Sequence, residues 1–288
     1  MHRARLDRSR RDLEQARTPI DGRMGADGER WGGWMDAEIG RVVALGASNL
    51  TRGFHTVVTT ARAAWGPEVE VLAALGHGRS YGVHSTFLVR KLPGILECGL
   101  WRQLGRSAAL PTRALITDVG NDILYGYSAQ QTLDWVGEAL VRLQRFTRDI
   151  VLTDLPIDSI RRSSRAKFYA LRSLYVPSCR LSYERLLETA ERVNAGLAGL
   201  AADRGARFCH LHESWYGFDP IHIRPALWRE AWQEILGLPR AAVDRRASGA
   251  EVLRVYLMRP ERRWLFGVEQ ATPQVGPRLP SGARIWLY

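Results

Sequence analysis

The chain has 288 residues, of which 45% are hydrophobic and 25% are charged. This composition is typical of globular proteins and excludes a largely disordered chain. The formal net charge is +11, but arginines alternate with acidic residues along most of the sequence. No continuous basic surface is therefore predicted, and we expect no nucleic-acid partner.

No apolar run approaches 18 residues, so the sequence predicts no membrane-spanning helix and no stable membrane insertion. The arginine-rich N-terminus has no apolar signal segment, and the three cysteines are far apart and odd in number. We therefore expect a cytoplasmic protein with reduced thiols. His210 and His212 would share one face of a strand, but no established zinc spacing surrounds them, so we expect no metal and no cofactor.

Three regions follow one another along the chain. Residues 1–37 show no sustained apolar period and mix arginines, acidic residues and glycines, which predicts a flexible arm. Residues 38–240 alternate strand and helix patterns and are predicted to form a catalytic domain. Residues 241–288 predict a β-rich extension, a candidate contact between copies in a homo-oligomer, with a hairpin and one more strand at 252–258, 264–268 and 284–288.

Within the second region, five short apolar runs predict buried strands at 42–45, 69–74, 114–117, 150–152 and 207–211. Helical spacing or helix caps follow at residues 50–65 and after Ser128 and Ser182. A helical stretch interrupted at Pro93 is expected after the glycine loop at 76–82, and residues 157–181 are expected to be irregular. This alternation predicts a parallel sheet covered by helices on both faces. Ligands of such sheets bind beyond the carboxyl ends of the strands.

Four polar loops follow these strands, at 46–49, 76–82, 119–122 and 219–222. Together they contain the groups that acyl transfer needs. Ser48 supplies a nucleophilic hydroxyl, His222 can accept its proton and protonate the leaving group, and Asp219 can orient the imidazole. Glycines let backbone N–H groups approach an oxyanion, and the side-chain amide of Asn121 adds a donor.

In these four loops the sequence resembles the SGNH (GDSL-type) hydrolase superfamily, whose blocks carry Ser, Gly, Asn and His in this order. The match covers residues 40–225. The resemblance implies an α/β fold: a three-layer α/β/α sandwich of flavodoxin-like type with a five-stranded parallel sheet. It also implies ester hydrolysis without a metal.

Carried over position by position, the resemblance implies a catalytic triad of Ser48, Asp219 and His222. The oxyanion hole would consist of the backbone N–H groups of Ser48 and Gly78 and the side chain of Asn121, with Gly76 as the alternative to Gly78. Three departures from the family pattern indicate a divergent member. At position 47 the family has aspartate and this chain has alanine, which predicts altered support for the loop that carries Ser48. The other two departures are at Val119 and Ile223.

The predicted function is that of a serine esterase that cleaves a carboxylic ester through an acyl-enzyme intermediate. The substrate would be a small-molecule, glycan or lipid ester. A short acyl group is expected, because bulky side chains are predicted to line the pocket at His77, Arg79, Tyr81, Tyr125 and Trp215. The alternatives are an acyltransferase that uses the same site and a catalytically inactive binding protein of the same fold. The arginines of residues 157–181 favour either an anionic substrate or a solvated surface.

Overall fold

The computed structural model describes residues 40–176, 179–237 and 248–288. Residues 37–288 form one compact unit, and the predicted arm at 1–37 lies outside the described residues. None of the described helices is both long enough and apolar enough to cross a membrane.

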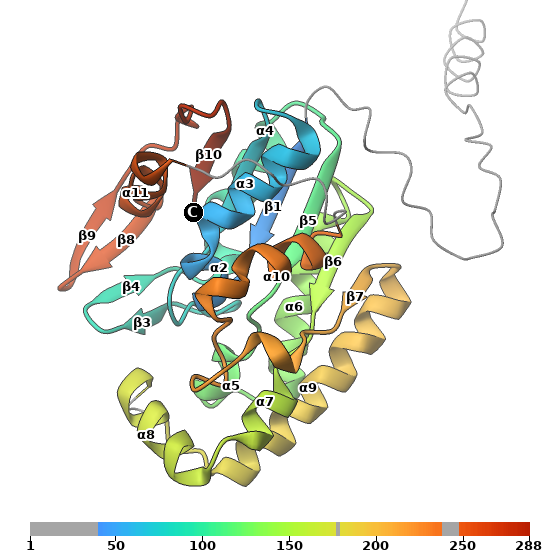
Figure 1. The fold of residues 1–288 in the computed structure, drawn as a ribbon, viewed down its shortest axis with the longest axis vertical. Coiled ribbons are helices and arrows are strands. Elements are labelled where there is room, and N and C mark those ends of the chain that lie inside the picture. Colours follow the sequence, from blue (N-terminus) through green and yellow to red (C-terminus); the bar gives the residue numbers. More distant parts are fainter. Residues whose placement is uncertain (1–39, 177–178, 238–247) are drawn as a thin grey trace, which may run out of the picture. The chain divides into compact units, whose positions relative to one another are not determined.

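A parallel sheet of six strands forms the centre of this unit (Figure 1). The strands lie in the order β10 (Arg284–Leu287), β2 (Glu70–Ala74), β1 (Arg41–Leu45), β5 (Thr112–Ile116), β6 (Asp149–Thr153) and β7 (Arg207–Cys209). Five of them are the predicted strands, so the predicted fold class is confirmed. The count is corrected from five to six because residues 284–287 pair with β2 in this sheet.

Both faces of the sheet are buried, which explains the continuous apolar runs in the sequence. Side chains alternate between the faces, as the pleat requires. In β1, Val43 and Leu45 belong to one core cluster, whereas Val42 and Ala44 belong to the other.

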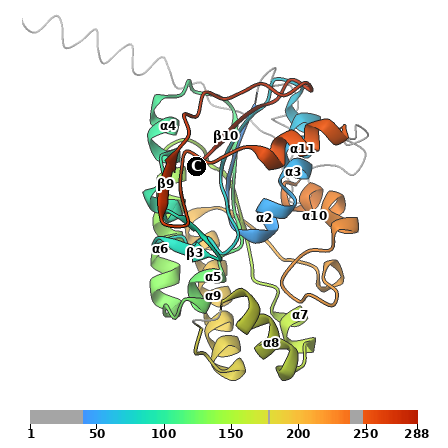
Figure 2. The ribbon, with the colours of Figure 1, turned by 90° about the vertical axis from the view of Figure 1, so that its left-hand side faces the viewer.

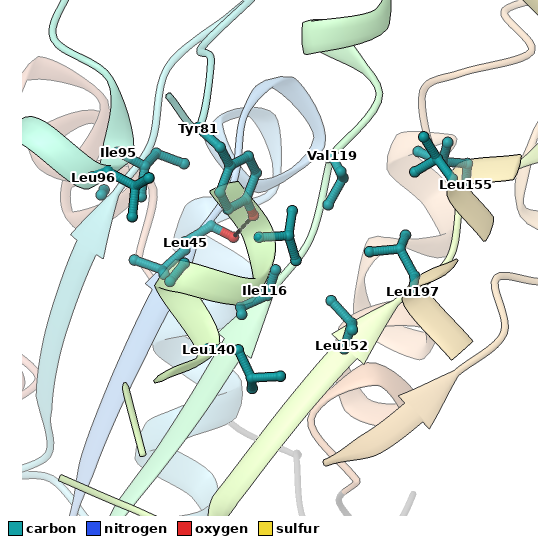
Figure 3. Packing of buried hydrophobic residues seen from close by; sticks show 14 of the residues in the cluster. Leu45, Tyr81, Ile95, Leu96, Ile116, Val119, Leu140, Leu152, Leu155 and Leu197 are labelled. Atoms are coloured by element: carbon teal, nitrogen blue, oxygen red, sulfur yellow. Dashed lines mark hydrogen bonds between the residues drawn. The ribbon is translucent and has the colours of Figure 1, made fainter. Parts of the chain in front are cut away.

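The first face is covered by α4 (Leu100–Arg106), α6 (Ala129–Leu143) and α9 (Tyr183–Arg204). Figure 3 shows part of this core, where Leu140 and Leu197 lie near Ile116 and Leu152 of the sheet. The predicted starts of α6 and α9 are confirmed, since Ser128 and Ser182 accept backbone N–H groups of the first turns.

The second face is covered by α3 (Phe54–Trp65), α10 (Trp228–Ile235) and α11 (Gly249–Leu257), as Figure 2 shows edge-on. The predicted helix at 50–65 is divided at Gly53 into α2 (Ser48–Arg52) and α3. A Cβ atom at Gly53 would lie 2.1 Å from the indole nitrogen of Trp232. The close approach of α10 therefore requires glycine at this position.

For two segments that connect strands of the main sheet, the predicted secondary structure is wrong. Residues 157–181 are largely helical, with α7 (Ile157–Arg162) and α8 (Arg165–Tyr175), and Ser164 caps α8. The interrupted helix expected around Pro93 is instead a hairpin of β3 (Ser85–Phe87) and β4 (Arg90–Leu92), followed by a short 3₁₀ turn (Ile95–Glu97) and α4.

The C-terminal region also differs from its prediction. Residues 252–258 were expected in a hairpin but lie largely in α11. The hairpin consists of β8 (Arg262–Leu265) and β9 (Val268–Ala271), and β8 pairs with β4 to complete a four-stranded antiparallel sheet. With β10 in the main sheet, this region packs as part of the compact unit.

Candidate active site

The three residues of the predicted triad form a continuous hydrogen-bonded chain. Ser48 is the first residue of α2, and its Oγ lies 2.9 Å from Nε2 of His222. Nδ1 of His222 lies 2.6 Å from Oδ2 of Asp219. With the proton on Nδ1, His222 donates to Asp219 and accepts from the serine hydroxyl, which is the arrangement that general-base activation of a nucleophile requires.

Asp219 is held as a carboxylate by its surroundings. Burial is the largest single effect and raises the pKa of Asp219, whereas the hydrogen bond and the charge of His222 lower it. The backbone N–H of Ile221, 3.2 Å from Oδ1, and the guanidinium of Arg52, 3.8 Å from Oδ2, act in the same direction. The net pKa of Asp219 is therefore below its ordinary value, and the carboxylate can stabilise a protonated imidazole.

A second aspartate fixes the nucleophile loop. Asp118 lies two residues after the end of β5 and adopts φ of +58°, a left-handed conformation that is uncommon outside glycine. Its Oδ2 accepts the backbone N–H groups of Ala47 at 2.9 Å and Leu50 at 3.0 Å, one on each side of Ser48. A carboxylate thus supports the loop even though residue 47 is alanine.

Asn49 connects the nucleophile loop to the histidine loop. Its Nδ2 donates to Oδ1 of Asp118 and to the carbonyl of Ile221, each at 2.9 Å. Its Oδ1 accepts the backbone N–H of Ile223 at 2.8 Å. The sequence analysis assigned no role to Asp118 or Asn49, although an aspartate directly after a strand and an asparagine directly after the serine were visible signals.

The glycine loop after β2 lies opposite Ser48. Gly78 adopts φ of +66°, and its carbonyl accepts the hydroxyl of Tyr125. Gly78 lines a cavity together with Ser48 and His222. Gly76 is not among the residues that line this cavity, so the geometry favours Gly78 over Gly76 as the oxyanion donor.

Asn121 begins the short helix α5 (Asn121–Leu124). Its side-chain amide donates one hydrogen bond to the carbonyl of Arg79 at 3.3 Å. An amide carries two N–H groups, so one remains for a ligand. Asn121 lines the same cavity as Ser48 and Gly78.

Asp122, next to Asn121, fixes the glycine loop at residues 76–82 through hydrogen bonds. Its carboxylate is fully buried, accepts the hydroxyl of Ser80, and accepts the backbone N–H of Tyr81 at 3.0 Å. Ser80 Oγ in turn accepts the backbone N–H groups of Gly82 and Val83. Burial raises the pKa of Asp122 to about 6, against the opposite effect of these two hydrogen bonds.

Three of the five expected substrate-binding residues are part of the core, which corrects that expectation. Arg79 is completely buried and donates to the carbonyls of Leu75 and Pro93, each at 3.1 Å, and of Tyr288. The Tyr81 hydroxyl lies within hydrogen-bonding distance of two carbonyls, one of them that of Leu45 (Figure 3). Trp215 is 1% exposed and packs in the core of the second face.

The other two expected substrate-binding residues lie at the site. His77 lines the cavity, and its ring packs against Phe87 with centroids 5.5 Å apart. Burial, with the positive charges of Arg90, His222 and Arg52, lowers the pKa of His77 to about 4. Its ring is therefore neutral near pH 7. Tyr125 holds the Gly78 carbonyl, as described above.

Two cavities meet at Ser48. The first has an empty volume of about 970 Å³, its open mouth included, and is lined mainly by apolar side chains below α7 and α8. The second, of about 680 Å³ on the same measure, is lined by Arg52, His77, Gly78, Phe87 and His222. Ser48 and Asn121 line both.

No group of three or more His, Cys, Asp or Glu side chains within the described part of the chain is arranged to hold a metal ion. His210 and His212 each pair with a carboxylate, Asp154 and Glu234 respectively. The chemistry that the site can perform with its own groups is deprotonation of Ser48, attack on a carbonyl carbon, and protonation of a leaving group.

Comparison with known proteins gives structural similarity alone. No family model and no curated protein matches the sequence. Est24, a carbohydrate acetylesterase from Sinorhizobium meliloti, is 12% identical, with 68% of this chain and 97% of that chain covered and a TM-score of 0.47. A lipolytic G-D-S-L family protein from Veillonella parvula is 14% identical, with 69% and 97% covered and a TM-score of 0.44.

The esterase EstA from Pseudoalteromonas sp. is 11% identical, with 68% and 96% covered and a TM-score of 0.41. These solved structures are thus of esterases and a lipolytic protein with a distantly similar fold. A functional assignment for this chain has to be argued from the geometry of its own site.

Proposed function

We propose that this chain is a divergent SGNH-type serine hydrolase that cleaves carboxylic esters through an acyl-enzyme intermediate. The observation that carries the proposal is the Asp219–His222–Ser48 chain, with contacts of 2.6 and 2.9 Å. It lies beyond the carboxyl ends of the parallel strands, where ligands of such folds bind, and Ser48 is accessible from two cavities.

In the proposed acylation step, Nε2 of His222 takes the hydroxyl proton while Oγ of Ser48 attacks the ester carbonyl carbon. The resulting tetrahedral oxyanion collapses, the bond to the alcohol oxygen breaks, and His222 gives its proton to the departing alkoxide. A water molecule then loses a proton to His222 and attacks the acyl-enzyme. Collapse of the second tetrahedral intermediate returns the proton to Ser48 and releases the carboxylic acid.

The oxyanion would be bound by the backbone N–H groups of Ser48 and Gly78 and by the free N–H of the Asn121 amide. The support for this assignment is that these three residues line one cavity. Such donors stabilise the transition state because they are already oriented before the charge develops.

The main reason for expecting a short acyl group no longer holds. That expectation depended on bulky side chains in the pocket, and Arg79, Tyr81 and Trp215 lie in the core. The acyltransferase alternative stays open, since an alcohol that replaces water in the second step uses the same residues. The proposed compartment is the cytoplasm, where the buried, unpaired Cys98, Cys179 and Cys209 would stay reduced.

The test is hydrolysis of p-nitrophenyl butyrate and labelling by a fluorophosphonate, with wild type, Ser48→Ala and the control Ser107→Ala. Ser107 lies at the end of α4 on another part of the surface. We expect Ser48→Ala to lose the label and at least about 1,000-fold in rate, whereas Ser107→Ala keeps both. A folded wild type with neither label nor turnover would favour the inactive binding protein, and equal rates in all three proteins would exclude Ser48 as the nucleophile.

A further inference from the structure

The first of the two cavities at Ser48 is the more apolar one. It runs from the serine below α7 and α8 towards α9, and its walls are mostly aliphatic and aromatic side chains: Ile123, Leu155, Ile160, Phe168, Leu186 and Ala190. Figures 1 and 2 place α5, α7 and α8 together at the end of the sheet that carries the polar loops.

Arg172 of α8 is the one cation among the described residues that line this cavity. It donates from Nη1 to the carbonyl of Leu181 at 2.7 Å, its guanidinium lies 5.0 Å from the ring centroid of Tyr169, and its buried Nε has no hydrogen-bond partner. Long cationic side chains commonly cover apolar surface with their stems while the head group finds polar partners. The stem of Arg172 therefore adds to the apolar wall, and most of the other lining side chains are apolar.

The second cavity, which also reaches Ser48, has a more polar lining. Arg52, the neutral ring of His77 and the catalytic His222 contribute polar groups there. His222 must protonate the leaving alcohol, so the alcohol portion of an ester belongs on this side. The carbonyl carbon at Ser48 then directs the acyl portion into the apolar cavity.

We propose that the apolar cavity is an acyl-chain site and that the preferred substrates are esters of unbranched acyl chains longer than butyryl. This inference rests on the proposed esterase function and adds the substrate class. An acetyl group would leave most of the apolar walls without contacts. Each further methylene that leaves water for this cavity raises kcat/KM about fourfold, until the cavity is filled.

Five of the residues that line this cavity come from the segment 157–176. Ile160 belongs to α7 and Phe168 to α8, and both are at most 9% exposed although neither helix lies against the main sheet. Ser164 caps α8 and so fixes where that helix starts. Residues 157–176, which were expected to be irregular, thus contribute apolar side chains to the wall of this cavity.

The experiment compares p-nitrophenyl acetate, butyrate, hexanoate and octanoate on wild type, Ala190→Phe and the matched control Ala198→Phe. Ala190 faces the cavity from α9, whereas Ala198 is on the exposed side of the same helix. We expect wild type to prefer hexanoate or octanoate over acetate by more than tenfold in kcat/KM. Ala190→Phe should lose at least tenfold on octanoate and less than threefold on acetate, and Ala198→Phe should match wild type.

Leu186→Ala serves as a second variant in case Ala190→Phe unfolds, which circular dichroism would show. It enlarges the cavity and should move the preferred chain length upward. A wild type that prefers acetate, or chain-length profiles that are identical in the folded variants, would overturn the acyl-chain site. Because such a wild type would still need Ser48 for turnover, this result is distinguishable from failure of the esterase proposal.

Binding of octanoate to Ser48→Ala, measured by calorimetry, tests the same site without turnover. Octanoate is the acid that the reaction would release, and its binding should be at least tenfold weaker when Ala190→Phe is added to Ser48→Ala. Binding that is absent, or that is unaffected by the added phenylalanine, would contradict the proposal.

Discussion

Two loops meet at the candidate active site, and each is held by one aspartate from the segment that follows β5. Asp118 binds the nucleophile loop directly, through backbone N–H groups on both sides of Ser48. Asp122 binds the glycine loop partly through the hydroxyl of Ser80 and is fully buried. Two carboxylates four positions apart thus fix two neighbouring loops, one at the rim of the site and one in the core.

This difference in depth separates their expected roles. Asp118 sets the position of the attacking oxygen, so its loss should affect the chemical step more than the stability of the fold. Asp122 lies in the interior with a pKa raised to about 6, so its ionisation should appear as a pH dependence of stability. The following predictions test this separation, with Asp219 as the reference for an aspartate that contacts the catalytic base itself.

The largest effect is expected for Asp219→Asn. An amide in place of the carboxylate cannot stabilise the charged imidazole, and it favours the tautomer of His222 that cannot accept the serine proton. We expect kcat on p-nitrophenyl butyrate to fall by about 1,000- to 10,000-fold with little change in KM. Asp158→Asn, on the exposed side of α7, is the control, and a loss below tenfold in Asp219→Asn would show that Asp219 is dispensable.

For Asp118→Asn we expect an intermediate loss. An amide presents an N–H₂ group either to the two backbone N–H donors or to the side-chain amide of Asn49, so at least one hydrogen bond is replaced by a repulsive contact. Misplacement of Ser48 should lower kcat by about 100-fold, and the change in Tm should be small. A variant that loses stability but keeps its kcat would reverse the roles assigned to Asp118 and Asp122.

For Asp122→Asn the expected signature is in the pH dependence of stability. The folded-state pKa of about 6 lies above the ordinary value of 3.8. Wild type therefore binds more protons folded than unfolded between these values, and it loses stability as pH rises through that window. Asn does not ionise, so the stability of the variant relative to wild type should improve by about 2 kcal/mol between pH 4 and pH 7.

Urea unfolding across this pH range measures the Asp122→Asn effect. The exposed Asp134 provides the control substitution Asp134→Asn, which should follow wild type at every pH. A constant difference between Asp122→Asn and wild type would mean that Asp122 does not titrate in this window.

The smallest effect is expected for His77→Gln. Because the pKa of His77 is lowered to about 4, its ring carries no proton to gain or lose between pH 5 and pH 8. The variant should keep kcat/KM on p-nitrophenyl acetate within about threefold, and the shape of its pH–rate profile in that range should be unchanged. A shifted acid limb would identify His77 as a second titrating group of the site.

The alternation of strands and helices could be predicted because it follows local rules: short apolar runs indicate buried strands, and helical spacing follows them. The assignment of Ser48, His222 and Asp219 depended on polar loops that follow these strands and resemble the SGNH blocks, and the structure places the three side chains in a continuous hydrogen-bonded chain.

The sequence did not predict α11, since Val252, Val255 and Tyr256 are residue types common in strands. Ser248, three residues before Glu251, indicated the start of a helix, but the strand propensity of the residues that follow favoured a strand.

The directions of the side chains in the glycine loop could not be predicted from the sequence either. Arg79 would ordinarily be placed at the surface, but the carbonyl groups of Leu75, Pro93 and Tyr288 accept its guanidinium N–H groups in the core. The contacts with Pro93 and Tyr288 exist only after those later segments have packed. In the same way, the support that Asp118 gives to Ser48 depends on a contact across 71 positions, which no local pattern contains.

The position of β10 has a consequence for how the molecule is made. Arg79, in the glycine loop, contacts the carbonyl of Tyr288 across 209 positions of sequence, and β10 pairs with β2 at the edge of the sheet. Contacts of such long sequence separation form slowly, because closure of a long loop precedes the gain from the contact. During synthesis, the strands β2, β1, β5, β6 and β7 emerge well before residues 284–288. The glycine loop would therefore be among the last parts of the site to mature, after the nucleophile loop has its own partners.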